Sequence, residues 1–356
     1  MIDEQKKFFI IDGIGGVPLG RELHEAFSDQ GILAVYLDAL RQRSRPFYGV
    51  RSAFHKARNK LRDKAAFHHL PRLQLKELEE EIRREKPTHI LVIGFLYKHY
   101  DPVAVKRLAQ EVGAKFLIYD TDSCNLYSRQ REFVFFLKNE LPLYDVVFSF
   151  SKVTTRFFRD TLGLNARHLP FGAKVMPERI ETPKLEVLFV GSADLRRIFL
   201  LEHIREWLVV RGARWRRNYP LMSAALRLRV DDRPVWGEEL LSLLQDSHIV
   251  LNITRSDFYG AETGVNLRIF EALAAGCFLL TDYCEEIAEI FKPGEQIEVF
   301  HSATELREKV EYYLANPREC ERIARLGHAE FLAAHCWSAR VRQILAQTAS
   351  LQAPTA

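Results

Sequence analysis

The sequence contains no hydrophobic stretch long enough to cross a bilayer. Apolar runs such as 8–11 are only a few residues long, whereas a membrane-spanning helix needs about 20 apolar residues. The same shortness argues against the apolar region of a secretion signal. We therefore expect a protein that is soluble, or at most peripheral to a membrane.

Cysteine is also scarce. Cysteines stand at positions 124, 277, 284, 320 and 336, and no two of them form a C-x-x-C pair. This spacing argues against a zinc site or a disulfide framework. Because unpaired thiols are typical of a reducing compartment, the sequence predicts a cytoplasmic protein.

Two common nucleotide-binding signatures are missing. Gly13 and Gly15 follow an apolar run, but Pro18 stands where G-x-G-x-x-G requires its last glycine. Gly191 and Ser192 follow another apolar run, without the G-K-[ST] of a phosphate loop. Both turns remain candidates for a close approach of the backbone to a ligand, and plain tight turns explain them equally well.

Charge of one sign is not in large excess, since the net charge is +4. The total therefore does not demand a nucleic-acid partner. The charge is nevertheless uneven, because residues 1–172 carry 28 Lys and Arg against 21 Asp and Glu, or +7, and the rest of the chain carries −3. This asymmetry predicts a basic surface on the first half.

Much of this basic charge falls in residues 41–64, which hold nine Lys and Arg and one acid, Asp63. Phe54, Ala57, Leu61 and Ala65 form an apolar stripe at helical spacing within the segment. We favour a helix that packs by this stripe and leaves its basic face in solvent. The alternatives are a helix that lies on an anionic membrane surface or one that grips an acidic acceptor.

Apolar runs and helical patterns alternate along the 356 residues, which predicts about two α/β domains with parallel sheets covered on both faces. Residues 173–184 hold two prolines and no periodicity, so we expect a linker there. Residues 211–236 also lack periodicity and are expected to be irregular. The predicted strands are 8–12, 32–37, 90–94, 116–119, 146–150, 185–190, 249–253 and 277–280. The predicted helices are 19–27, 73–84, 102–112, 153–162, 195–209, 238–244, 267–274, 303–314, 317–332 and 341–351.

The stretch from Gly264 to Leu280 has the clearest functional pattern. A glycine turn opens a helix, and Gly276 ends it before a buried strand. Arg268 and Glu271 lie three residues apart near the helix N-terminus, where free N–H groups and the helix dipole favour an anion. This arrangement suggests a nucleotide site, and a surface ion pair is the equally weighted alternative.

Polar residues follow several other predicted strands. Because ligands bind beyond the carboxyl ends of parallel strands, we single out Arg196 and Arg197 as phosphate ligands in the second half, together with Arg255. In the first half these ends carry His99, Asp120 and Asp122. Two acids without a third ligand are a weak metal signal, and helix capping explains one of them equally well.

Short motifs with a familiar order run through both halves of the chain. The second half has FVGS at 189–192, VLNI at 250–253, RIFEALAAG at 268–276, LTDY at 280–283, YLANP at 313–317 and HCWSAR at 335–340. The first half has YDTD at 119–122, YDVVF at 144–148 and HLPF at 168–171. This ordered set resembles the CgeB-type (spore-protein-like) branch of the group-1 glycosyltransferases.

The resemblance implies an α/β GT-B fold, with two Rossmann-like domains facing across a cleft. Residues 1–172 would form the acceptor-side domain and 173–184 the linker. Residues 185–337 would bind the nucleotide sugar, and residues 338–356 would form a C-terminal helix and tail that packs back on the first domain.

The resemblance also implies roles for particular residues. Glu271 matches the second glutamate of the family's E-x7-E motif, which binds the donor ribose, whereas Thr263 occupies the position of the first and Glu262 lies one residue away. Arg268 would add charge or brace the loop, and Arg196 or Arg197 would supply positive charge to the diphosphate. The other implied donor-site residues are Gly191, Ser192, Arg255, Gly264, Val265 and Asn266, the last three through their main-chain amides.

The implied activity is transfer of a sugar from a nucleotide-sugar donor to an unidentified acceptor, with retention and without a metal or a further cofactor. Asp120, Asp122 and His99 are the candidate catalytic residues on the acceptor side. The alternatives are a nucleotide-sugar epimerase of GT-B shape and a non-catalytic nucleotide-binding or surface assembly protein. We expect no nucleic-acid partner, and residues 41–64 keep a peripheral membrane contact open.

Overall fold

The computed structural model describes residues 6–123, 129–177 and 183–349. The chain divides into two compact units, which contain residues 1–170 with 341–356 (unit 1) and residues 171–340 (unit 2). Residues 178–182 of the expected linker, the tail 350–356 and Cys124 lie outside the described residues. Each unit holds one six-stranded, parallel sheet.

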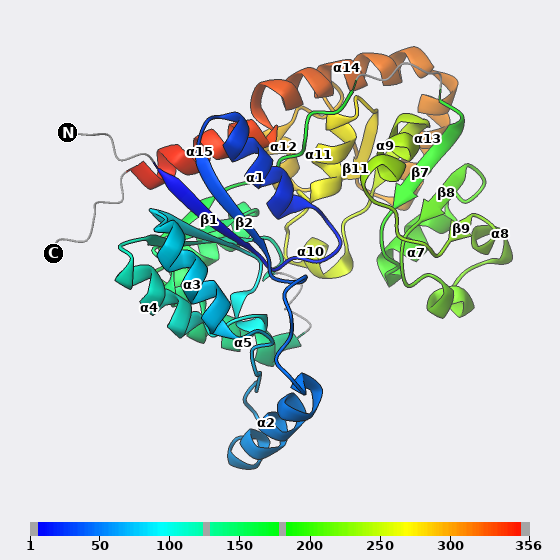
Figure 1. The fold of residues 1–356 in the computed structure, drawn as a ribbon. Helices are drawn as coiled ribbons and strands as arrows, with labels where there is room; N and C mark the ends of the chain where they lie inside the picture. Colours follow the sequence, from blue (N-terminus) through cyan, green and yellow to red (C-terminus); the bar gives the residue numbers. More distant parts are fainter. Residues whose placement is uncertain (1–5, 124–128, 178–182, 350–356) are drawn as a thin grey trace. The chain divides into compact units, whose positions relative to one another are not determined.

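The sheet of unit 1 has the strand order β2-β1-β3-β4-β5-β6 (Figure 1). The order reverses between β1 and β3, which is the point in such sheets where ligands bind. The strands are β1 (Lys7–Asp12), β2 (Leu33–Asp38), β3 (His89–Ile93), β4 (Lys115–Asp120), β5 (Val146–Ser149) and β6 (Ala166–His168). The helices are α1 (Leu19–Asp29), α2 (Tyr48–Arg62), α3 (Leu75–Glu85), α4 (Pro102–Glu111), α5 (Gln130–Asn139), α6 (Lys152–Arg156) and α15 (Trp337–Ala349).

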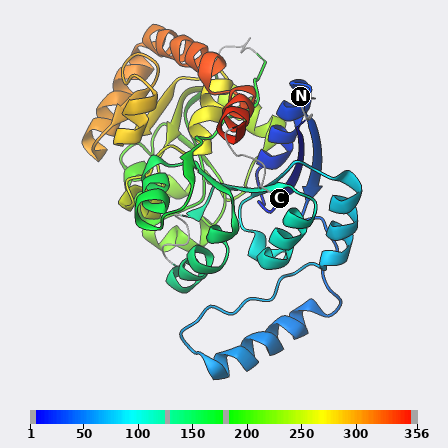
Figure 2. The same cartoon turned by 90° about the vertical axis from the view of Figure 1, so that its left-hand side faces the viewer.

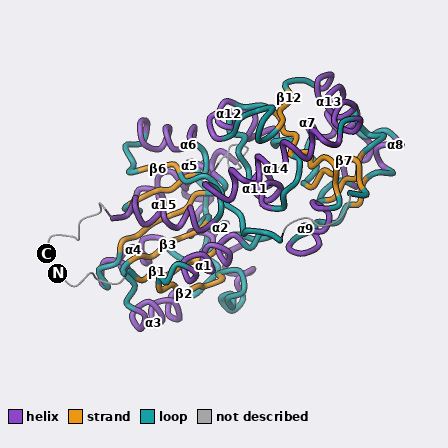
Figure 3. Tube along the Cα trace, turned by 90° about the horizontal axis from the view of Figure 1, so that it is seen from above, coloured by secondary structure: helices purple, strands orange, loops and turns teal. Residues whose placement is uncertain are grey.

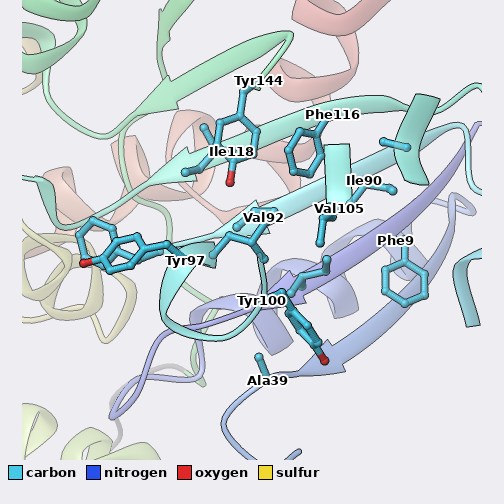
Figure 4. Close-up of a cluster of buried hydrophobic side chains, with 14 of the residues drawn as sticks. Phe9, Ala39, Ile90, Val92, Tyr97, Tyr100, Val105, Phe116, Ile118 and Tyr144 are labelled. Carbon is cyan, nitrogen blue, oxygen red and sulfur yellow. The ribbon is translucent and has the colours of Figure 1, made fainter. Parts of the chain in front are cut away.

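Alternate residues of the central strands fill the core of unit 1. Phe9 on β1, Ile90 and Val92 on β3, and Phe116 and Ile118 on β4 are all buried in one cluster (Figure 4). Successive strand residues point to opposite faces, so their neighbours, such as Phe8 and Leu91, fill the other face and are equally buried. The near-continuous apolar runs in the sequence follow from this burial on both faces.

The sheet of unit 2 has the order β12-β11-β10-β7-β8-β9, which is the order of the classic dinucleotide-binding sheet, with its reversal between β7 and β10. Helices flank the strands, as seen from above in Figure 3. The strands are β7 (Leu185–Val190), β8 (Leu208–Arg211), β9 (Val230–Asp231), β10 (Ser247–Asn252), β11 (Leu279–Asp282) and β12 (Glu298–Phe300). The helices are α7 (Leu195–Glu202), α8 (Ala224–Arg227), α9 (Gly237–Gln245), α10 (Ser256–Gly260), α11 (Leu267–Ala274), α12 (Glu285–Ile290), α13 (Ala303–Ala315) and α14 (Pro317–Ala334).

The predicted helix 195–209 was wrong in its second half. Helix α7 ends at Glu202, and residues 208–211 form β8, which pairs with β7. Leu208 and Val210 are buried in the sheet, where branched side chains fit well. The expected irregular stretch 211–236 also contains α8 and the short strand β9.

The expected packing of the apolar stripe in residues 54–65 was also wrong. Phe54 and Leu61 are 70% and 85% exposed, and Ser52 is the buried residue of α2. The stripe remains uncovered because the helix turns its polar side toward the chain: Tyr48, Ser52, His55 and Asn59 are the buried or half-buried residues of α2, and the Tyr48 hydroxyl donates to the Leu70 carbonyl.

The terminal helix α15 makes contacts with unit 1. Gln343 Nε2 donates to the His168 carbonyl at 3.1 Å, and Lys6 Nζ donates to the Leu345 carbonyl at 3.3 Å. Among the described residues, no helix combines the length and the apolar character that a bilayer crossing requires.

Candidate functional site

The carboxyl ends of β7, β10 and β11 gather polar and cationic residues at one edge of the second sheet. Gly191 and Ser192 follow β7, Thr254 follows β10, and Asp282 ends β11. Because β7 and β10 are paired neighbours at the reversal of strand order, this edge is the expected ligand position of the fold.

Two backbone segments approach closely beside β7. A Cβ on Gly212 would lie 2.0 Å from the Gly191 carbonyl oxygen, and the φ of Gly212 is +147°, so only glycine fits there. The same Gly191 carbonyl accepts a hydrogen bond from Trp215 Nε1 at 3.0 Å. The turn after β7 is thereby held in one conformation.

Arg197 braces this turn from the inside. It is buried, and its Nε and Nη2 donate to the Ile253 carbonyl while Nη1 donates to the Ser192 carbonyl. Burial lowers the pKa of Arg197 to about 10; the nearby Arg255 and Arg196 act in the same direction, and Asp194 and Asp282 act against it. With every guanidinium nitrogen engaged, Arg197 joins β7 to β10 and adds positive charge to the edge.

Arg196 keeps part of its guanidinium in solvent. Its Nη1 donates to Asp282 Oδ2 at 2.6 Å and to the Thr254 carbonyl at 2.9 Å. The guanidinium carbon lies 3.7 Å from the ring centroid of Tyr259. Within the described residues, Nε and Nη2 make no hydrogen bond, so two parallel donors remain for an anion.

The two helix N-termini at this edge differ in their caps. Asp194 caps α7 and also accepts from the Ser256 amide, so a carboxylate already occupies that terminus. The neutral side chain of Asn266 caps α11 by accepting from the Arg268 amide. Because an anion is attracted by the helix dipole and repelled by a carboxylate, α11 offers the better anion position.

A continuous polar network ties α11 to Arg196. Asn266 Nδ2 donates to Asn252 Oδ1, and Asn252 Nδ2 donates to Thr281 Oγ1. Asp282 then accepts from Thr281 Oγ1, from the amide and hydroxyl of Thr254, and from Arg196. Asp282 was not among the site residues predicted from the sequence, although a buried strand that ends on a charged residue was a local signal for it.

Arg268 and Glu271 meet on α11, but not as a surface ion pair. Arg268 Nη1 lies 2.7 Å from Glu271 Oε2, and the two side chains are only 14% and 15% exposed. In the described part of the chain, Arg268 Nε and Nη1 are buried without a well-aligned hydrogen bond. Burial raises the pKa of Glu271, and Arg268 partly offsets that rise. A ligand could therefore accept hydrogen bonds from Arg268 and donate hydrogen bonds to Glu271.

The loop before α11 turns Thr263 inward and Glu262 outward. Thr263 is 1% exposed, and its hydroxyl donates to the Phe258 carbonyl, whereas Glu262 is exposed with a positive φ of 57°. Gly264 follows, where a Cβ would lie 2.6 Å from Cys284 Sγ. The Asn266 amide donates to the Gly264 carbonyl, so of the three predicted amides this one is engaged within the loop.

In unit 1, His99 lies at the reversal between β1 and β3. Its Nε2 is 3.3 Å from the Gly13 carbonyl oxygen, and its ring touches the position that a Gly13 Cβ would take. Burial lowers the pKa of His99 to about 4. Nδ1 is buried without a hydrogen bond to any described residue.

Asp120 ends β4 as an internal acceptor. Its Oδ1 accepts from the Ser123 amide and hydroxyl and from the Asp122 amide, and its Oδ2 accepts from the Ser149 hydroxyl. Burial raises the pKa of Asp120 to about 6 against these hydrogen bonds. Asp122, two residues further along the loop, is half-buried. Asp120 thus shapes the loop that presents Asp122.

Asp120 and Asp122 follow β4 in unit 1 and Asp282 ends β11 in unit 2, but these carboxylates do not belong to a metal cluster among the described residues. Across residues 6–123, 129–177 and 183–349, no three His, Cys, Asp or Glu side chains gather in a way that could hold a metal ion.

Comparisons with known proteins agree with this architecture. Residues 196–346 match the model of a glycosyl transferase-like family, and no curated protein sequence matches the chain. Among solved structures, a glycosyltransferase from Rickettsia africae is 10% identical, with a TM-score of 0.59, over 98% of this chain and 99% of the other. Sucrose-phosphate synthase from Thermosynechococcus elongatus is 14% identical, with a TM-score of 0.62, over 97% and 99%.

Anabaena HepE, solved in complex with UDP and glucose, is similar to the same extent. It is 12% identical, with a TM-score of 0.61, over 97% of this chain and 100% of the other. These likenesses, together with the two parallel six-stranded sheets, confirm the predicted α/β GT-B fold with Rossmann-like sheets.

Proposed function

We propose that the protein is a glycosyltransferase of the group-1, CgeB-type branch that takes a nucleotide-sugar donor at the carboxyl edge of its second sheet. The observation that carries this proposal is the concentration of Arg196, Arg197 and Arg255 beside the neutral-capped N-terminus of α11. The match of residues 196–346 to a glycosyl transferase-like family supports it. The four described cysteines are free thiols, which supports the cytoplasmic location that we also propose.

Arg196 and Arg197 have different roles in this proposal. Arg196 binds the diphosphate, because it holds two unused donors next to solvent, and Arg197 positions the turn at Gly191 and Ser192. The amides of Gly264 and Val265 and the side chain of Arg268 complete the diphosphate site. Glu271 accepts the ribose hydroxyls, for which a largely buried carboxylate paired with Arg268 is well suited.

Transfer requires the bond between the sugar and the diphosphate to break, so negative charge grows on the phosphate oxygens. Fixed donors that bind this charge more strongly in the transition state accelerate the reaction. Because the arginines and α11 supply positive charge, we propose a metal-independent reaction. Retention at the anomeric carbon, which we also propose, rests on the resemblance to the group-1 glycosyltransferases. Residues on the edge of unit 1, with Asp122 and His99 as candidates, would orient or deprotonate the acceptor.

Complexes of a structurally similar protein indicate which donors to test first. HepE has been solved with UDP, with UDP and glucose, and with UDP-glucose. UDP-sugars are therefore the first donors to test, followed by GDP-, dTDP- and CDP-sugars.

Release of nucleoside diphosphate from these donors tests the proposal. We expect slow hydrolysis of one donor class, unchanged by EDTA and lost in Glu271→Gln. Conversion of the donor sugar to its epimer would favour the epimerase alternative. Absence of any turnover, together with intact nucleotide binding, would favour a non-catalytic nucleotide-binding or surface assembly protein.

A further inference from the structure

Helix α2 is amphipathic in the reverse of the usual sense. Tyr48, Ser52, His55 and Asn59 recur at helical spacing and are the residues of α2 that are buried or half-buried. On the opposite side, Val50, Phe54 and Leu61 are 73%, 70% and 85% exposed. A surface helix normally buries its apolar stripe against the core, whereas α2 presents it to solvent.

Cations border this apolar stripe on both sides. At 100° per residue, Arg51 and Arg58 fall along one border and Lys60 along the other, and Arg62 and Lys56 lie further round, toward the buried side. All five are exposed, and none of them forms an ion pair with any residue in the described ranges. The single acid of the segment, Asp63, is engaged with the amides of Ala65 and Ala66. The outward side of α2 is thus both apolar and strongly positive.

The position of α2 suits an external partner. Figures 1 and 2 show α2 set apart from the sheet of unit 1 and joined to it by two extended segments. The helix is held on its polar side by the hydrogen bond from Tyr48 to Leu70. Its apolar side therefore contributes little to the stability of the fold, and exposed apolar groups of this kind mark interaction surfaces.

We propose that α2 docks unit 1 on an anionic lipid bilayer. Phe54, Leu61 and Val50 enter the boundary between headgroups and acyl chains, and the bordering lysines and arginines contact the lipid phosphates. A bilayer fits because it offers an apolar layer directly beneath a layer of negative charge, which matches a stripe bordered by cations. A nucleic acid or a uniformly acidic peptide would satisfy the cations and leave the stripe in water. This inference does not depend on the proposed donor site.

Sedimentation of the full chain with lipid vesicles tests the proposal. We expect binding to vesicles of equal parts phosphatidylcholine and phosphatidylglycerol, and little binding to phosphatidylcholine alone. Each cation near an anionic surface is worth about a fivefold factor in affinity, so Arg51→Gln with Arg58→Gln should weaken binding by about twenty-five-fold at low salt. Phe54→Ser with Leu61→Ser keeps the charge and should weaken binding by at least about tenfold.

The matched control is Leu221→Ser with Leu228→Ser, which removes apolar side chains that are 51% and 88% exposed in unit 2. This variant should bind vesicles as the wild type does. The proposal is overturned if the wild type does not bind anionic vesicles, or if the Phe54/Leu61 variant binds as strongly as the control. Binding to DNA or polyglutamate without vesicle binding, or a dimer lost in the Phe54/Leu61 variant without vesicle binding, would overturn it as well.

Fluorescence gives a second test that does not depend on removing the stripe. In Phe54→Trp, insertion should shift the added tryptophan emission to shorter wavelength when anionic vesicles are mixed in. Emission that stays unchanged while the protein sediments with the vesicles would contradict docking through α2.

Discussion

The carboxyl edges of the two sheets carry opposite kinds of polar group. In unit 2, Arg196 and Arg197 converge there, and the buried carboxylate that ends β11, Asp282, is paired with Arg196. In unit 1, Asp120 and Glu140 are buried without an arginine partner, and burial raises their pKa values to about 6 and about 7. The same sheet architecture therefore gives one edge suited to an anion and another suited to neutral, hydroxyl-bearing ligands.

The largest expected effect compares the two buried aspartates. Asp282→Asn removes the charge partner of Arg196 and should lower the free energy of unfolding by about 3 kcal/mol. Asp120→Asn should change it by less than about 1 kcal/mol at neutral pH, because an amide avoids the cost of a buried charge. Chemical denaturation measures both, and equal losses in the two variants would remove the distinction between the edges.

The pH dependence of stability tests the environment of His99. The folded-state pKa of about 4 lies below the ordinary value of 6.5, so unfolding takes up a proton between these pH values. Wild-type stability should therefore fall by about 3 kcal/mol more than that of His99→Gln as the pH decreases from 6.5 to 4. A difference between the two proteins that is constant over this window would show that His99 is not buried in its neutral form.

A smaller effect is expected for the arginine that faces solvent. Arg196→Lys keeps a cation beside Asp282 but loses the two parallel donors, so affinity for the nucleoside diphosphate should fall about tenfold. Arg307→Lys is the matched control, because Arg307 also pairs with a carboxylate, Glu206, and stacks on an aromatic ring, Trp207. Calorimetry that gives the same dissociation constant for both variants would exclude Arg196 from the diphosphate site.

The sequence was sufficient to predict the elements that repeat a strong pattern. The apolar runs at 8–12 and 185–190 and the helix that begins near Leu267 were found because burial on both faces of a strand, and a glycine at each end of a helix, leave local signals. The turn between α7 and β8 was missed because Leu200, Leu201, Leu208 and Val209 continue an apolar pattern across it.

The site was predicted less completely than the fold. Arg196 and Arg197 are adjacent in sequence, and only tertiary contacts assign one to the Ile253 carbonyl and the other to Asp282. Likewise, nothing local indicates that α2 turns its polar residues inward, since the direction of an amphipathic helix depends on the segment that it packs against.

The central proposal is tested most directly by calorimetric titration with UDP, GDP, dTDP and CDP. The titrations are made on the wild type, on Glu271→Gln and on Glu311→Gln. Glu311 is a half-exposed glutamate of α13 that pairs with Arg307, so its replacement serves as the control. We predict saturable binding of one nucleotide, weakened at least about tenfold in Glu271→Gln and unchanged in Glu311→Gln. Absence of binding to all four nucleotides, or equal affinity in the three proteins, would contradict a nucleotide-sugar site at the carboxyl edge of the second sheet.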